Sequence, residues 1–171
     1  AKLFYGEDIA PIFEIFLPMA TSAKSIDRIY HYYIDFVTGK SKKLLKENDI
    51  SVGDWVGEFK PEKINVIPLF EDMKHMLASA DILREYLKDK KVGYQRVFLA
   101  RSDPAVNYGS ISAVILTKIA LQRLYKLSLE INKPIYPILG AGSAPFRGNL
   151  RPQTVDGILR GYPSVQTFSI Q

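Results

Sequence analysis

Short apolar runs recur along the chain, and each one stops abruptly at a polar or turn-forming residue. They cover residues 12–19, 64–70, 94–100, 135–139 and 165–170. Apolar runs of this length with such boundaries are typical of strands buried on both faces of a parallel sheet. The segments between them carry apolar residues three or four positions apart, which is typical of helices that cover a sheet. The pattern therefore predicts an α/β protein.

The predicted helices alternate with these strands. The first begins at a capping hydroxyl, Ser22 or Ser25, and ends near Gly39. A short helix over 72–78 and a second over 81–90, capped by Ser79, follow the second strand. The longest helix is predicted over 110–132, and the last over 152–160. The apolar spacing of the helix over 110–132 predicts that several of its residues are buried: Ile111, Val114, Ile115, Ile119, Leu124, Leu127 and Ile131.

Five strands joined by four helical crossovers predict a partial (β/α)8 barrel. Three of the crossovers repeat at intervals of roughly 30 to 40 residues, near the average unit of such a barrel. The first is longer because of an irregular insertion over 41–62. The single tryptophan, Trp55, marks this insertion as a packed loop or a subunit contact, and we expect it to be packed. Five strands are too few to close a barrel. We therefore expect residues 1–171 to be a single segment of a barrel domain in a longer protein.

Composition narrows the classes of function. The 171 residues are 47% hydrophobic and 24% charged, and they include no cysteine. Disulfides and thiolate metal sites are thereby excluded, which suits a cytoplasmic protein. No apolar run approaches the roughly 20 residues of a membrane span. The net charge of +5 comes from scattered lysines, clustered only over 40–46, without a nucleic-acid motif. We expect neither membrane insertion nor nucleic-acid binding.

Charged and polar residues suited to catalysis or ligand binding follow three of the predicted strands. Glu71 follows the second strand, and Arg101, Ser102 and Asp103 follow the third. The fourth runs into a glycine-rich segment, 140–148, that contains Arg147. In parallel α/β proteins, catalytic and binding residues lie at the carboxyl ends of the strands. Because the only histidines, at positions 31 and 75, are far apart in the sequence, a metal here would take oxygen ligands, which favours magnesium or manganese. The pattern indicates a divalent metal beside an anionic substrate.

A purely structural interpretation remains open for each motif taken alone. Ser-Asp-Pro after a strand is often only a turn held by an Asx hydrogen bond. Glu71 could be an acid at the start of a helix, where the helix dipole favours it. The three strand ends together favour a functional site.

Four runs in this order resemble phosphoenolpyruvate carboxylase of the short archaeal type. They are Glu-Ile-Phe-Leu-Pro-Met at 14–19, Ile-Pro-Leu-Phe-Glu at 67–71, Phe-Leu-Ala-Arg-Ser-Asp-Pro-Ala at 98–105, and Gly-Ala-Gly-Ser-Ala-Pro-Phe-Arg-Gly at 140–148. The resemblance implies a carbon–carbon lyase that carboxylates phosphoenolpyruvate with bicarbonate to give oxaloacetate and phosphate. It also implies Mg²⁺ or Mn²⁺ as cofactor, a cytoplasmic location and a homotetramer.

The resemblance also implies roles for individual residues. Glu71 and Asp103 match the family's metal ligands, and Arg147 matches the arginine that serves the bicarbonate or phosphate end. Gly140 and Gly142 are expected to keep the loop backbone close to the bound anion. The bacterial and plant enzymes have His-Gly-Arg-Gly-Gly in this loop, so that Ala141 stands here where they have an arginine.

Arg101 is a second departure, since those enzymes have a tyrosine there. We hypothesise that Arg101 supplies the missing positive charge, as a catalytic and substrate-binding residue beside Ser102. The family's catalytic histidine lies outside this sequence. Two other interpretations stay open. One is another magnesium-dependent barrel lyase acting on phosphoenolpyruvate or pyruvate, and the other is a non-catalytic assembly fragment.

Overall fold

Five parallel strands form one sheet, in chain order. The computed structural model describes residues 3, 6, 10–57, 59–148 and 150–171. The strands are β1 (Glu14–Leu17), β2 (Asn65–Phe70), β3 (Gln95–Ala100), β4 (Ile135–Gly142) and β5 (Thr167–Ile170). The predicted α/β class and the five parallel strands are confirmed. The sheet is open, with β1 and β5 at its edges.

The helices differ from the prediction in several places, among them the first helix, which is α-helical only to Tyr32, and the insertion, which contains a short helix. They are α2 (Ala23–Tyr32), α3 (Val52–Val56), α4 (Met73–Leu87), α5 (Ser102–Tyr108), α6 (Ser110–Glu130) and α7 (Val155–Gly161), with π-helical η1 (Tyr33–Val37) and 3₁₀ turns η2 (Thr38–Lys42) and η3 (Pro152–Thr154). The two helices predicted after β2 are one, α4, which is capped by Asp72, and Ser79 is buried inside it. Helix α5 was not predicted, because Ser-Asp-Pro after a strand is typical of a turn, whereas here these three residues begin the helix. Proline is tolerated in the first turn of a helix, where its missing N–H has no partner to lose.

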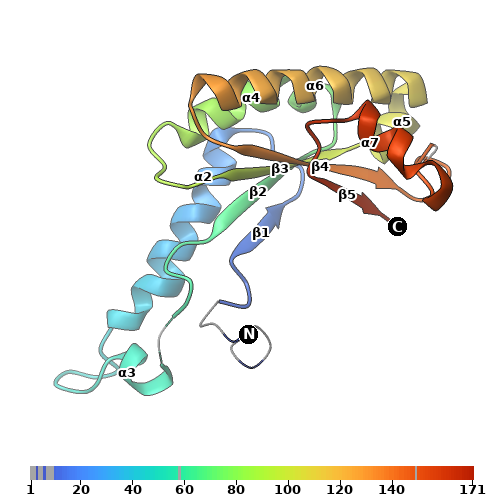
Figure 1. Cartoon of the computed structure of the whole chain (residues 1–171). Coiled ribbons are helices and arrows are strands. Elements are labelled where there is room, and N and C mark those ends of the chain that lie inside the picture. The colour runs from blue at the N-terminus through green and yellow to red at the C-terminus, as the bar shows by residue number, and fades with distance from the viewer. Residues whose placement is uncertain (1–2, 4–5, 7–9, 58, 149) are drawn as a thin grey trace.

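The insertion after α2 extends away from the sheet (Figure 1). Of the two candidate caps of α2, Ser22 is the one used, and its hydroxyl accepts a hydrogen bond from the Ser25 N–H at 3.2 Å. Helix α3 lies at the far end of the extension and begins at a capping box formed by Ser51 and Asp54. Trp55 on α3 is 69% exposed, so the expectation that it is packed was wrong. A helix of five residues is too short to cover a tryptophan on its own.

One face of the sheet carries the hydrophobic core. Alternate residues of the three central strands point to this face, and helices α2, α4 and α6 cover it (Figure 1). The strand residues in this core include Val66, Phe70, Val97, Leu99 and Leu139, and the helix residues include Ile26, Met76, Leu83, Leu124 and Leu127. Each such side chain contributes about 1.5–3 kcal/mol when fully buried. This face therefore holds the helices on the sheet.

The opposite face of the sheet is polar at the start of the strands and has no described helix over it (Figure 1). The Glu14 carboxylate on β1 accepts hydrogen bonds from the Tyr94 hydroxyl and from Arg96 Nη1, both at 3.0 Å. Arg96 Nη2 also donates to the Thr167 hydroxyl on β5 at 3.2 Å. Side chains from the edge strands and from β3 thus meet across this face.

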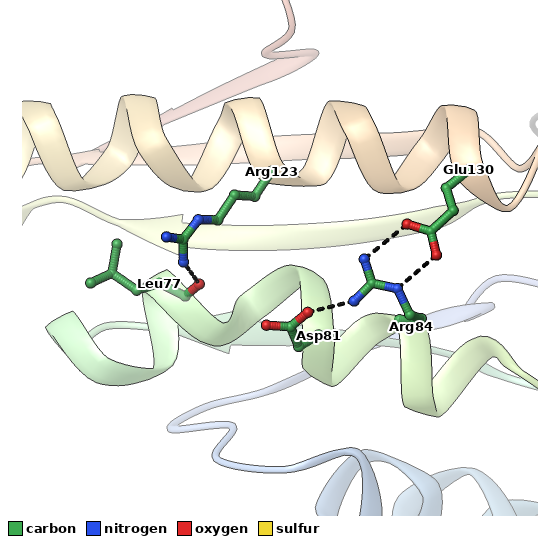
Figure 2. Close-up of polar contacts among 5 residues, drawn as sticks. All are labelled: Leu77, Asp81, Arg84, Arg123 and Glu130. Carbon is green, nitrogen blue, oxygen red and sulfur yellow. Dashed lines mark hydrogen bonds and ion pairs between the residues drawn. The ribbon is translucent and has the colours of Figure 1, made fainter.

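Polar contacts fix how α4 lies along α6 (Figure 2). Arg84 donates to both carboxylate oxygens of Glu130, at 2.8 and 2.9 Å, and it also pairs with Asp81. One turn from the start of α4, the Leu77 carbonyl accepts a hydrogen bond from Arg123 at 2.5 Å. Exposed ion pairs of this kind contribute only about 0–1 kcal/mol. The apolar contacts therefore hold the helices together, and the arginines fix their register.

None of the described helices is both long enough and apolar enough to cross a membrane.

The burial predicted for α6 is confirmed only in part. Leu124 and Leu127 are buried as predicted, but Ile111 and Ile115 are exposed. The apolar spacing of α6 extends almost all round the helix, so it could not show which positions face the sheet.

Candidate functional site

Parallel pairing brings the predicted site residues to one edge of the sheet. Glu71 follows β2, and Arg101 follows β3 and leads directly into α5. A loop over 143–148 follows β4. The register pairs Phe70 with Leu99, and Ala100 with Gly140. The carboxyl ends of these three strands are therefore level, and the residues that follow them are neighbours.

The carboxyl groups of Glu71 and Asp103 lie against each other. Burial and, next in importance, the negative charge of Asp103 raise the pKa of the Glu71 carboxyl. A hydrogen bond shared between the two carboxyl groups raises it further, while the Met19 N–H donates to Glu71 and lowers it. Two like charges held this close disfavour each other's ionisation. The structure thus brings together the two residues predicted to bind metal.

Asp72, the acid next to Glu71, has a different task. Its side chain caps α4 by accepting a hydrogen bond from the His75 N–H at 3.0 Å, and its other oxygen lies 2.5 Å from His75 Nδ1. Burial alone would raise the pKa of Asp72, but the hydrogen bonds from His75 outweigh burial and lower it. The helix-start acid is therefore Asp72, and Glu71 is free of that structural role.

The chemistry of the donors fits a hard divalent cation. A cation between Glu71 and Asp103 would remove the repulsion that raises the pKa of Glu71. Magnesium commonly takes one or two protein carboxylates and completes its shell with water and substrate oxygens. No group of three or more His, Cys, Asp or Glu residues placed to share a metal occurs in the described part of the chain. The pair is thus suited to a cation that keeps open positions.

Arg101 is buried beneath the glycine-rich loop. The residue is 7% exposed, and its Nε and Nη2 both donate to the Phe146 carbonyl, the first at 3.2 Å. A side chain added at Gly148 would place its Cβ 3.4 Å from Arg101 Nη2. Arg101 therefore holds the loop in place through the Phe146 carbonyl. The sequence could not show this role, because the acceptor is a backbone carbonyl 45 residues away.

Arg101 and Arg147 line the same small cavity, of about 230 Å³. It lies between the loop and the helices, and its walls include Ser110, Phe146 and Tyr162. Glu71 and Asp103 do not line it. The backbone of Arg147 is hydrogen-bonded within the loop, its N–H donating to the Ser143 carbonyl at 3.1 Å, but its guanidinium group makes no hydrogen bond or ion pair with the residues that the structure describes. The two predicted arginines are therefore brought together, one engaged by the loop and the other available to an anion.

The glycines of the loop motif belong partly to β4. Gly140 and Gly142 are strand residues, whereas we expected them in the loop. A Cβ at Gly140 would overlap the ring of Phe98 on the neighbouring strand. Gly142 has a φ of +73°, and a Cβ there would lie 2.9 Å from the Cβ of Ser102 at the start of α5. Both glycines thus permit close approach between neighbouring elements at the edge of the site.

Comparison with known proteins decides the family. The family model described as phosphoenolpyruvate carboxylase matches residues 1–171. The chain belongs to the phosphoenolpyruvate carboxylase family. It is similar to proteins of that name from Methanospirillum hungatei (60% identical), Methanothermobacter thermautotrophicus (53%) and Pyrococcus abyssi (52%). Each alignment covers the whole chain and 35–36% of the relative.

The resemblance to the archaeal phosphoenolpyruvate carboxylases is therefore confirmed at the level of the family. The chain spans about a third of the length of the curated relatives that it matches. The roles assigned to Glu71, Asp103, Arg101 and Arg147 remain predictions, which the contacts above now make specific.

The close packing at Gly140 predicts a loss of stability on substitution. In the full-length protein, Gly140→Ala should lower the free energy of unfolding by about 1–3 kcal/mol, because the methyl group displaces Phe98. Gly157→Ala is the matched control, since a Cβ there meets nothing within 4 Å in the middle of α7. The control should be neutral or stabilising by up to about 1 kcal/mol. Urea unfolding measures both, and equal effects would contradict the packing argument.

The raised pKa of Glu71 predicts a pH-dependent stability in metal-free protein. The folded state holds the Glu71 proton more tightly than the unfolded state, so stability falls as pH rises from the ordinary glutamate pKa through the raised one. Glu71→Gln removes this loss, so the variant should gain on the wild type across that window. Thermal unfolding with a chelator, from pH 4 to pH 8, measures it. Glu85→Gln, an exposed position on α4, is the control. A constant difference between Glu71→Gln and wild type at all pH values would refute the interaction.

Proposed function

We propose that the full-length protein carboxylates phosphoenolpyruvate with bicarbonate, giving oxaloacetate and phosphate, with Mg²⁺ or Mn²⁺ as cofactor. One observation carries the proposal. The phosphoenolpyruvate carboxylase family model matches the whole chain. In this chain, the neighbouring carboxyl groups of Glu71 and Asp103 lie at the same edge of the sheet as the loop that contains Arg147, whose side chain has no described partner. A metal beside an anion site is what this reaction needs, because both substrates are anions.

In this proposal Glu71 and Asp103 hold the metal through carboxylate oxygens. When bound, the metal supplies positive charge that stabilises an enolate oxygen. The two acids also orient the phosphoenolpyruvate, because their fixed positions at the ends of β2 and β3 determine where the open coordination sites point. Their separate backbone anchors, the Met19 N–H and helix α5, keep them from moving apart.

Arg147 binds the bicarbonate or phosphate end in this proposal. Its planar fork suits both anions, and no described residue competes for it. Arg101 adds positive charge in the same cavity and holds the loop through the Phe146 carbonyl. Ser102, at the start of α5 and against Gly142, contributes its hydroxyl at the substrate side. Gly140 and Gly142 let the loop strand approach these groups.

Several broader properties belong to the same proposal. The five strands would be part of a closed (β/α)8 barrel, which would cover the polar face around Glu14 and Arg96. The full-length enzyme would be a cytoplasmic homotetramer, as the family resemblance implies.

Labelled bicarbonate provides the direct test. With Mg²⁺, the full-length protein should incorporate label from bicarbonate into oxaloacetate.

The metal site is tested by Mn²⁺ binding, measured by electron paramagnetic resonance. Glu71→Gln and Asp103→Asn should each weaken this binding by more than about tenfold. Label incorporation should fall with them. Asp81→Asn, which removes an acid that pairs with Arg84 on the helical surface, should change neither. A wild-type protein that releases pyruvate or oxaloacetate without label would refute the carboxylase. Unchanged Mn²⁺ affinity in both variants would refute the metal site.

The two arginines should respond differently to replacement by lysine. Arg147→Lys should lower kcat/KM at least tenfold, which is 1.4 kcal/mol, while the melting temperature stays the same. Arg101→Lys should raise the KM for phosphoenolpyruvate about tenfold and should also lower the melting temperature, because it breaks a buried two-donor contact. Arg151→Lys, at an exposed position after the loop, is the control. If Arg101→Lys melts early but binds phosphoenolpyruvate normally, Arg101 only braces the loop.

A further inference from the structure

Helix α6 has a second apolar face that the sheet does not cover. Its first face is buried against the sheet and α4, and includes Leu116, Ala120, Leu124 and Leu127. A second stripe follows the helical repeat along the other side: Ile115, Ile119, Gln122, Tyr125 and Leu129. Ile115 is 53% exposed, Tyr125 58% and Leu129 65%. A helix that is apolar on two sides is normally covered on both.

This stripe forms one wall of a groove of about 1270 Å³. The floor is the start of β4, at 134–137, and the other wall is the segment that leads into β5, at 161–166. Prolines 134, 137 and 163 contribute rigid apolar surface to it. The groove therefore follows α6 over most of its length, and its lining is mainly apolar.

The groove occupies the next position in the layer of helices. Helices α2, α4 and α6 lie side by side on one face of the sheet (Figure 1), one for each of the first three connections between strands. The fourth connection should place a helix beside α6. It supplies only η3 and the seven residues of α7, about 10 Å long, against about 31 Å for the 21 residues of α6. Of α7, only Gly161 lines the groove.

The sheet topology indicates what fills this position. The outer edge of β5 is unpaired in the described part of the chain, and every pairing in the sheet is parallel. A further parallel strand beside β5 would need a right-handed crossover, which would run over the helix-covered face, next to α7 and the groove. The relatives are about three times as long as this chain, which leaves ample polypeptide to supply it.

We propose that the groove along α6 binds an amphipathic α-helix from the part of the full-length protein outside these 171 residues. The stripe on α6 has apolar residues three or four positions apart, so its partner helix presents a matching apolar stripe. Gln122, at the middle of the stripe, favours a hydrogen-bonding residue opposite it. Lys118 reaches from α6 to the opposite wall, where its ammonium group donates to the Gly161 carbonyl at 2.7 Å and lies over the ring of Tyr162, so its charge is already engaged.

Cysteine labelling of the full-length protein tests the proposal without reference to activity. These 171 residues contain no cysteine, and any others in the full-length protein are first replaced by serine. Leu129→Cys and Tyr125→Cys place a thiol in the groove. Lys126→Cys is the matched control, since Lys126 is exposed on the same helix and does not line the groove. The native groove variants should react with maleimide at least tenfold more slowly than the control, at all protein concentrations.

A bifunctional cross-linker then identifies the occupant. The thiol at position 129 should link to a residue of the same polypeptide outside the 171-residue segment, and mass spectrometry should find the product in single chains. Labelling as fast as in the Lys126→Cys control would show that the groove is open and would overturn the proposal. Links between two chains, with protection lost on dilution, would assign the groove to a second copy and would equally overturn it. Neither result depends on whether the protein is a carboxylase.

Discussion

Consecutive strands of this protein pair in parallel, and this pairing sets where its helices and its polar residues lie. A parallel strand cannot follow its neighbour through a tight turn, so each connection must cross back over the sheet. Because such crossovers are right-handed, α2, α4 and α6 all lie on one face, where they bury Phe70, Leu99 and Leu139. The same constraint puts every strand's carboxyl end at one edge. Core and candidate site are therefore two consequences of a single topology.

The electrostatics of that edge are unfavourable by themselves. Burial and, after it, the charge of Asp103 disfavour the ionised form of Glu71 and raise its pKa. Arg101 is a buried cation whose acceptor is a neutral carbonyl rather than a carboxylate. Such arrangements concentrate at functional sites, where a bound ion or substrate completes them. By contrast, Arg84 and Glu130 satisfy each other on the helical surface and stabilise a helix pair.

Two surfaces are left uncovered by the residues that the structure describes. One is the sheet face crossed by the Glu14–Arg96 ion pair, and the other is the apolar side of α6. They lie on opposite sides of the sheet, so one further helix could not cover both. The relatives are about three times as long as this chain, and in proteins of that length further polypeptide is available to cover such surfaces. The proposed barrel would cover the first, and the proposed helix would cover the second.

Sequence patterns alone predicted the five strands, their order along the chain and the acids and arginines that follow them. These features are local, because an apolar run and its first polar residue are adjacent in the chain. Tertiary structure decided what depends on distant neighbours. It made Asp72 rather than Glu71 the helix cap, and it gave the buried Arg101 a carbonyl acceptor. It also left Trp55 and Ile115 exposed. Side-chain periodicity shows that a residue is apolar, but only packing shows whether another element covers it.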